Sequence, residues 1–128
     1  MSVQISADDV RRFFTLLEAR AWDDLRALVA DDLVYEVPQT RERIRGAAAW
    51  LQFCVDFPGE WHLAVDRVVI DPVAREAAVV VAASLDGAPL PNLAFLRFDD
   101  AGLVTRLEDW WPEPYEPPSR GAAAVERY

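Results

Sequence analysis

Several residue types are scarce in this chain, and each scarcity excludes a class of protein. Lysine is absent, so the 13 basic residues are all arginine, and 22 acidic residues bring the net charge to −9. An acidic chain without a basic run lacks a phosphate-binding surface, so we expect no nucleic-acid partner. The single cysteine, Cys54, allows no intrachain disulfide, and the single histidine, His62, leaves few nitrogen ligands for a metal. We therefore expect neither a metal nor another cofactor.

Long apolar runs are missing as well. No stretch approaches the roughly 20 apolar residues that cross a bilayer. The first residues carry neither the basic start nor the apolar segment of a signal peptide. The apolar fraction is nonetheless 52% over 128 residues, which is enough for one hydrophobic core. These features predict a single cytoplasmic domain over residues 1–128 with no membrane partner, its core over about residues 6–111 and its tail, 112–128, extended and proline-rich.

The first half of the chain is predicted to be mainly helical. Ser6 and Asp9 match a capping box. The apolar residues that follow recur at helical spacing: Val10, Phe13, Phe14 and Leu17. A second helix is predicted over 22–29, capped by one of two aspartates, then a strand over 33–37 and a polar loop over 39–45. A third helix follows Gly46, with an apolar stripe made by Trp50, Phe53, Cys54 and Phe57.

From residue 60 the apolar period changes to two, which indicates strands. Four are predicted, over 61–70, 77–85, a segment ending at Phe98, and 103–111. The sequence Asp86-Gly87 predicts a tight hairpin between the second and the third. Helices followed by antiparallel strands give an α+β fold with the helices on one face of the sheet. A sheet that curls around a helix leaves a cavity at its open end, where a ligand is expected.

Several short sequence segments add to this fold prediction. They are Trp22-Asp-Asp-Leu25, Val34-Tyr-Glu-Val-Pro38 and the segment from Arg97 to Trp110, together with Gly46 before the third helix. With the element order, they resemble the nuclear transport factor 2-like superfamily, and within it the SnoaL-like, polyketide cyclase-like group. The resemblance implies a cone-shaped, curved antiparallel or mixed sheet wrapped around three N-terminal helices, also described as a cystatin-like α+β roll.

The resemblance also implies binding partners. It implies an apolar pocket for a small hydrophobic molecule and a homodimer that pairs through the outer face of the sheet. It does not imply one activity, because the superfamily includes ketosteroid isomerase, polyketide cyclases, epoxide hydrolases and transport factors.

Matching the last strand to this family predicts the catalytic residues. The match places Val104, Arg106, Glu108 and Trp110 inside the cavity. Glu108 is then predicted to act as a general acid or base, with Arg106 orienting it or binding an anion. The alternative for these two residues is an ion pair that only neutralises itself.

The same match predicts residues that contact a ligand. They are Phe14, Tyr35, Trp50, Phe53, Asn92 and Trp110. The alternative for the aromatic residues is ordinary core packing. His62 is predicted on the outer sheet face beside Asp66, and Cys54 is predicted to be an inert core thiol.

The match argues against ketosteroid isomerase activity. That chemistry needs a carboxylate base, a tyrosine and a protonated aspartate, and the corresponding positions hold Val37, Thr15 and Ala94. Three hypotheses remain. The protein is a cofactor-independent lyase, isomerase or hydrolase, a non-catalytic binding protein, or a dimerisation module whose cavity is filled by tryptophan side chains.

Overall fold

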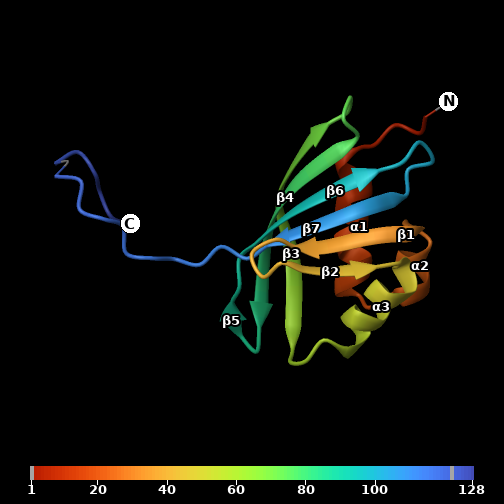
Figure 1. Cartoon of the computed structure of the whole chain (residues 1–128), viewed down its shortest axis with the longest axis horizontal. Helices are drawn as coiled ribbons and strands as arrows, with labels where there is room; N and C mark the ends of the chain where they lie inside the picture. The colour runs from red at the N-terminus through yellow and green to blue at the C-terminus, as the bar shows by residue number, and fades with distance from the viewer. Residues whose placement is uncertain (1, 122) are drawn as a thin grey trace.

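The computed structural model describes residues 2–121 and 123–128, and it shows helices packed on one face of a curved sheet (Figure 1). The helices are α1 (Ala7–Glu18), α2 (Trp22–Arg26) and α3 (Ala47–Asp56). The strands are β1 (Val29–Val37), β2 (Glu42–Arg45), β3 (Trp61–Asp71), β4 (Glu76–Leu85), β5 (Ala88–Pro89), β6 (Asn92–Phe98) and β7 (Val104–Trp110).

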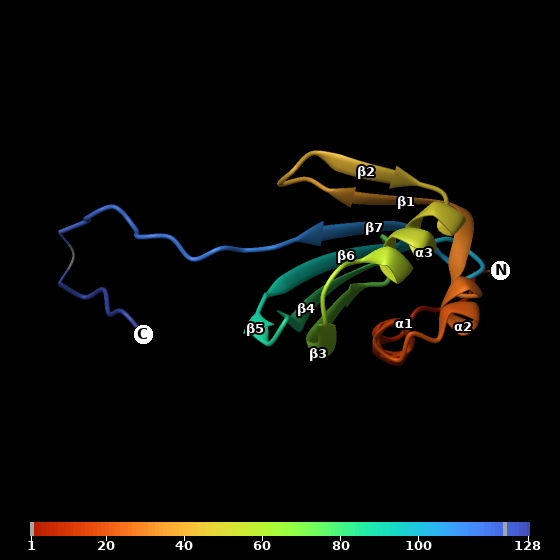
Figure 2. The same ribbon diagram turned by 90° about the horizontal axis from the view of Figure 1, so that it is seen from below.

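The strands of the described residues form one mixed sheet in the order β2-β1-β7-β6-β4-β3, with β5 paired to β4. Neighbouring strands are antiparallel except β1 and β7, which run parallel. Figure 2 shows the sheet bending from β2 to β3, with the helices on its concave side. The predicted α+β fold with a curved, mixed sheet is confirmed.

Helix α1 forms because its start is capped and one face is apolar. The hydroxyl of Ser6 accepts a hydrogen bond from the Asp9 N–H, and the Asp9 carboxylate accepts one from the Ser6 N–H, so the predicted capping box is present. The predicted apolar stripe of this helix is buried. Within it, Phe13 stacks on Trp50 of α3 with ring centroids 5.9 Å apart. This contact joins α1 to α3 beneath the open end of the sheet.

Two segments of the first half differ from the prediction. Helix α2 ends at Arg26 and has no side-chain cap, and strand β1 already begins at Val29, which pairs with Val104 of β7. The predicted polar loop over 39–45 contains strand β2, which pairs with β1 at the edge of the sheet. Ile44 is the one residue of this four-residue edge strand that packs against the core, so its sequence is too short to carry an alternating pattern.

Strand β7 contains a bulge that reverses its side-chain direction. In its pairing with β6, Phe98 is opposite Val104 and Arg97 is opposite Arg106, so Thr105 is an extra residue. Because successive side chains of a strand point to opposite faces, one extra residue moves every later side chain to the other face. Val104 and Leu107 are both buried, and they are separated by three positions instead of two.

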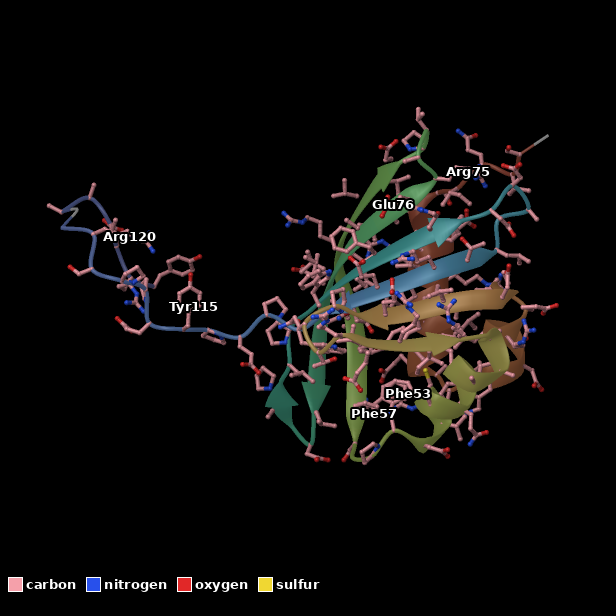
Figure 3. All side chains as sticks on the ribbon, viewed as in Figure 1. Phe53, Phe57, Arg75, Glu76, Tyr115 and Arg120 are labelled. Atoms are coloured by element: carbon pink, nitrogen blue, oxygen red, sulfur yellow. The ribbon has the colours of Figure 1, made fainter. Side chains whose placement is uncertain are left out.

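The C-terminal segment leaves the domain after β7 as an extended chain (Figure 1). Its start is fixed by Gln39, whose side-chain amide donates to the Trp111 carbonyl oxygen at 3.1 Å and accepts from the Trp111 N–H. Farther along, Tyr115 and Arg120 project from the tail, and Tyr115 is exposed (Figure 3). No helix among the described residues is long and apolar enough to span a membrane.

Candidate functional site

An apolar pocket of about 100 Å³ lies between the concave face of the sheet and helices α1 and α3. It is lined by Phe13, Phe14, Leu17, Tyr35, Trp50, Phe53, Cys54, Phe57, Trp61, Leu63, Ala83, Ser84, Leu85, Leu90, Asn92, Leu107, Asp109 and Trp111. Phe53 and Phe57 are 39% and 37% exposed, and Figure 3 shows them together at the end of α3. They form part of the mouth, whereas the buried Trp50 and Phe13 form part of the floor.

Most residues predicted to contact a ligand line this pocket. They are Phe14, Tyr35, Trp50, Phe53 and Asn92, and their role in binding stays a prediction. Trp110 is the exception, because it follows the bulge and its indole N–H donates to Glu108 at 2.8 Å. Trp61 and Trp111 line the pocket in its place.

The predicted inward placement of Arg106 and Glu108 is wrong. Both follow the bulge at Thr105, so they lie on the outer face of the sheet and do not line the pocket. Arg106 pairs there with Glu36, which also accepts a 2.7 Å hydrogen bond from Arg43. The Glu36 side chain is only 13% exposed, so this cluster holds β1, β2 and β7 together.

The bulge instead turns Asp109 into the pocket, although the sequence pattern assigned it to the outer face. Tyr35 donates a 2.7 Å hydrogen bond to Asp109 Oδ2. Asn92 donates through Nδ2 to Asp109 Oδ1 at 3.2 Å and to the Trp110 carbonyl oxygen at 3.1 Å. The three side chains come from β1, β7 and β6, which are adjacent in the sheet, so the topology brings them together.

A signal for Asp109 was present in the sequence. Val104 and Leu107 are the aliphatic residues of β7, and their spacing of three puts both on one buried face only if a residue bulges out between them. With that bulge, Asp109 falls on the same face as Leu107.

The electrostatics of the pocket centre on Asp109. Burial raises the pKa of this carboxyl from 3.8 to about 6, although the hydrogen bonds from Tyr35 and Asn92 favour its charged form. Burial and the neighbouring Asp109 also raise the pKa of Tyr35 far above its usual range, so its phenol stays protonated and donates. Burial and the Asp109 charge raise the pKa of Cys54 to about 12, which leaves an unreactive thiol.

The positions matched to the groups of ketosteroid isomerase lie elsewhere. Val37, Thr15 and Ala94 do not line the pocket, and the Thr15 hydroxyl donates to the Arg11 carbonyl oxygen on α1. Among the described residues, no group of three or more histidine, cysteine, aspartate or glutamate side chains is arranged to hold a metal ion.

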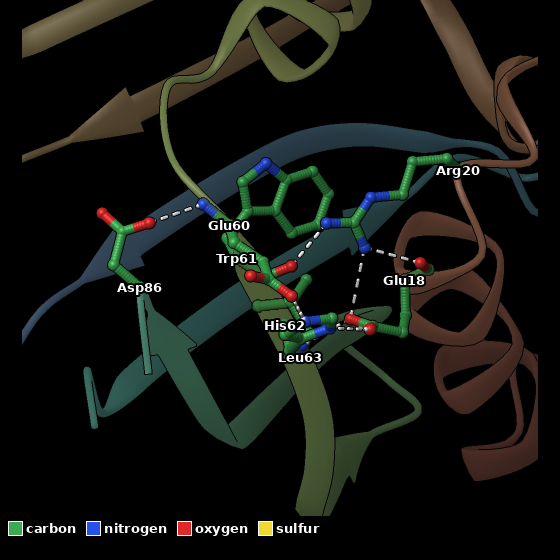
Figure 4. Close-up of polar contacts among 7 residues, drawn as sticks. All are labelled: Glu18, Arg20, Glu60, Trp61, His62, Leu63 and Asp86. Carbon is green, nitrogen blue, oxygen red and sulfur yellow. Dashed lines mark hydrogen bonds and ion pairs between the residues drawn. The ribbon is translucent and has the colours of Figure 1, made fainter. Parts of the chain in front are cut away.

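The rim of the pocket at β3 is fixed from outside by the end of α1 (Figure 4). The guanidinium of Arg20 lies 3.5 Å from the ring centroid of Trp61 and donates to its carbonyl oxygen. Glu18 accepts from the Leu63 N–H at the free edge of β3. His62 contacts Glu18 through Nδ1 at 2.7 Å, and not Asp66 as predicted, because Asp66 sits at a bulge of β3.

Comparison with known proteins identifies the family to which the chain belongs. A family model described as a SnoaL-like domain matches residues 10–107. No curated protein matches the chain. Among solved structures, the chain is similar to a protein from Kribbella flavida DSM 17836 that is provisionally named a ketosteroid isomerase. The two share 44% identity with a TM-score of 0.88, over 94% of this chain and 87% of that chain.

Two more distant structures share the fold. A provisionally named polyketide cyclase from Sinorhizobium meliloti is 23% identical with a TM-score of 0.70, over 81% of this chain and 94% of that chain. An LEH-like epoxide hydrolase from M. tuberculosis is 22% identical with a TM-score of 0.65, over 82% of this chain and 80% of that chain. Similarity at this level concerns the fold and not the activity.

Proposed function

The chain belongs to the SnoaL-like domain family, and we propose that it is a cofactor-independent enzyme in which Asp109 transfers a proton on a small, largely apolar molecule. One observation carries the proposal. A single carboxylate, held by Tyr35 and Asn92, faces an otherwise apolar pocket. A lone acid with a raised pKa in a cleft of this kind is a typical catalytic group.

The pKa of Asp109 suits proton transfer in both directions. A group whose pKa is about 6 is mostly ionised at neutral pH and is still readily protonated during a reaction. Tyr35 and Asn92 bind different oxygens of the carboxylate, and each oxygen has two lone pairs, so acceptor sites remain for a ligand.

A single carboxylate fits a reaction in which the proton that it removes is returned to the same molecule. Ionised Asp109 takes a proton from a carbon next to a carbonyl group, and the electron pair of the broken C–H bond moves into an enolate. The protonated carboxyl then returns the proton to another carbon of the same molecule. The net reaction is an isomerisation. Before the enolate is protonated, its carbon can instead attack a second carbonyl group of the same molecule and close a ring.

Tyr35 and Asn92 are positioning residues in this scheme. Their hydrogen bonds fix the direction of the carboxylate and stabilise its charged form. The apolar walls exclude water, which increases the basicity of Asp109.

Hydrolysis of an epoxide fits the pocket less well. Opening an epoxide with water needs one group to activate the water and a second to protonate the leaving oxygen. Among the described lining residues, Asp109 is the one carboxylate, and no arginine accompanies it. Proton transfer without hydrolysis therefore has the better support.

The proposal is tested by proton exchange, which needs no knowledge of the natural substrate. NMR in D2O follows deuterium uptake next to the carbonyl group of 3-methylcyclohex-2-enone, with wild type, Asp109→Asn and the outer-face control Glu108→Gln. We expect wild type and Glu108→Gln to accelerate uptake equally and Asp109→Asn to lose at least about 100-fold. Equal rates for wild type and Asp109→Asn would exclude this role, and binding of the ketone without exchange would favour a binding protein.

We further propose that the chain forms a homodimer through the outer face of the sheet. Leu93, Phe95 and Trp110 are only half-buried on that face in a single chain, and Val69 is 59% exposed. Such an apolar patch on the sheet supports pairing with a second copy, as the family resemblance implies.

A further inference from the structure

We infer that the pocket takes an uncharged molecule of about one ring, and that Trp61, pinned by Arg20, sets the size limit. The inference rests on the proposed function in one respect, because the polar end of the ligand is taken to meet Asp109. The size, charge and rim of the pocket supply the argument.

The charges around the pocket oppose an anionic ligand. Asp109 is the one described lining residue that is charged at neutral pH, since Tyr35 and Cys54 stay protonated. The arginine nearest the rim, Arg20, is already neutralised by Glu18 at 3.5 Å. A carboxylate or phosphate ligand would therefore meet a half-buried negative charge with no counter-charge in the wall.

Acidic groups also flank the mouth beside Trp61. The Asp86 carboxylate accepts a 2.8 Å hydrogen bond from the Glu60 N–H, and the Glu60 side chain is exposed (Figure 4). These carboxylates add to the repulsion of an anion that approaches the pocket.

A cationic ligand fits the wall less well than a neutral one. An ammonium group has three N–H donors that need acceptors once it is buried. Besides Asp109, the described lining side chains with oxygen atoms are Tyr35, Ser84 and Asn92, and the rest of the wall is apolar, so few acceptors replace the water around an ammonium group. A neutral hydroxyl or carbonyl group makes smaller demands.

The volume limits the size of the ligand. A cavity of about 100 Å³ holds roughly seven to ten water-sized groups. The pocket therefore takes in about one six-membered ring, and a four-ring molecule would have to extend out through the mouth at Phe53 and Phe57.

Trp61 keeps the pocket at this size. The guanidinium of Arg20, which does not line the pocket, lies 3.5 Å from the ring centroid of Trp61. Arg20 also donates to the Trp61 carbonyl oxygen and to the Glu18 carbonyl oxygen, so the backbone and ring of Trp61 are held together (Figure 4). Trp61 is therefore a fixed wall, and its removal should enlarge the pocket.

Isothermal titration calorimetry near neutral pH tests the inference with three probes on the full chain. They are 3-methylphenol, its anionic counterpart 3-methylbenzoate, and the four-ring phenol estradiol. We expect saturable binding of 3-methylphenol, a Kd at least about tenfold higher for 3-methylbenzoate, and no saturable binding of estradiol.

Substitutions at the rim of the pocket test whether Trp61 sets the size limit of the ligand. Trp61→Ala and, more weakly, Arg20→Gln should gain saturable binding of estradiol, which wild type lacks. The matched controls Trp110→Phe and Arg97→Gln lie on the outer face and should leave all three affinities unchanged. If Trp61→Ala does not fold, Arg20→Gln and the wild-type comparison of the three probes decide the question.

Several results would overturn the inference: equal affinity for the phenol and the benzoate, tight binding of estradiol to wild type, no gain for either rim variant, or no binding of 3-methylphenol. Its failure can be told apart from that of the proposed function. Charge and size selectivity without Asp109-dependent exchange would leave the inference standing and remove the catalytic role. Asp109-dependent exchange without that selectivity would do the reverse.

Discussion

The phenol of Tyr35 donates a 2.7 Å hydrogen bond to the carboxylate of Asp109 across two parallel strands, between residues 74 positions apart in the chain. This bond depends on the register of β1 against β7, because Tyr35 is opposite Leu107, two residues before Asp109. The sheet topology and the candidate site are therefore specified by the same pairing.

The stability of the protein should fall as pH rises through the titration of Asp109. Its pKa is about 6 in the folded chain and near 3.8 when unfolded, so between these values the folded state binds more protons. Stability is then highest below about pH 4 for this group and lower by about 3 kcal/mol above pH 6. Urea unfolding of wild type and Asp109→Asn across this range should show the slope in wild type alone; parallel curves would contradict it.

Removing the Tyr35 hydroxyl should raise the pKa of Asp109 further. The hydrogen bond from Tyr35 favours the charged carboxylate, so Tyr35→Phe shifts the lower limb of the pH profile for proton exchange to higher pH. The exposed tail residue provides the control, and Tyr115→Phe should leave the profile in place. An unchanged profile in Tyr35→Phe would show that the bond does not tune Asp109.

Inserting one alanine between Arg106 and Leu107 should destabilise the fold severely. The insertion turns Leu107 and Asp109 to the outer face and Glu108 into the apolar pocket. We expect a loss of about 4 kcal/mol or more. Deleting Thr105 instead removes the extra residue and keeps Val104 opposite Phe98 and Arg106 opposite Arg97, so it should cost little more than its hydrogen bond to the Arg97 carbonyl oxygen, about 1 kcal/mol. Equal losses for the two variants in urea would argue against this role for the bulge.

The ion pairs around Glu36 should contribute more than an exposed pair. Glu36 is 13% exposed and contacts Arg43 and Arg106, whereas Asp31, the partner of Arg26, is 94% exposed. Glu36→Gln should cost about 1–2 kcal/mol in the free energy of unfolding and Asp31→Asn close to nothing. Chemical unfolding of both variants makes the comparison, and equal losses would contradict it.

A charge on the outer sheet face should separate the proposed dimer. Phe95→Glu places a carboxylate in the half-buried patch of that face, so light scattering should report a monomer where wild type is a dimer. Val73→Glu, in the exposed turn between β3 and β4, is the control and should remain dimeric. A monomeric wild type would refute the proposal.

Where the sequence carries short-range signals, the predictions agree with the structure. The capping box of Ser6 and Asp9 starts α1, and Asp86 and Gly87, both with positive φ, make the predicted hairpin. The alternating apolar residues of β6 place Asn92 on the same inward face as Ala94, Leu96 and Phe98. These features depend on residues a few positions apart, so the pattern is complete within one segment.

The chain itself determined its helices, its hairpin and the apolar residues that build one curved sheet, because caps, turns and hydrophobic periods are local properties. Only the tertiary structure decided which acid enters the pocket. The extra residue at Thr105 is defined by its pairing with a neighbouring strand, and this pairing directs Asp109 inward and Glu108 outward. The strand alone, with its assumed strict alternation, pointed to the wrong carboxylate.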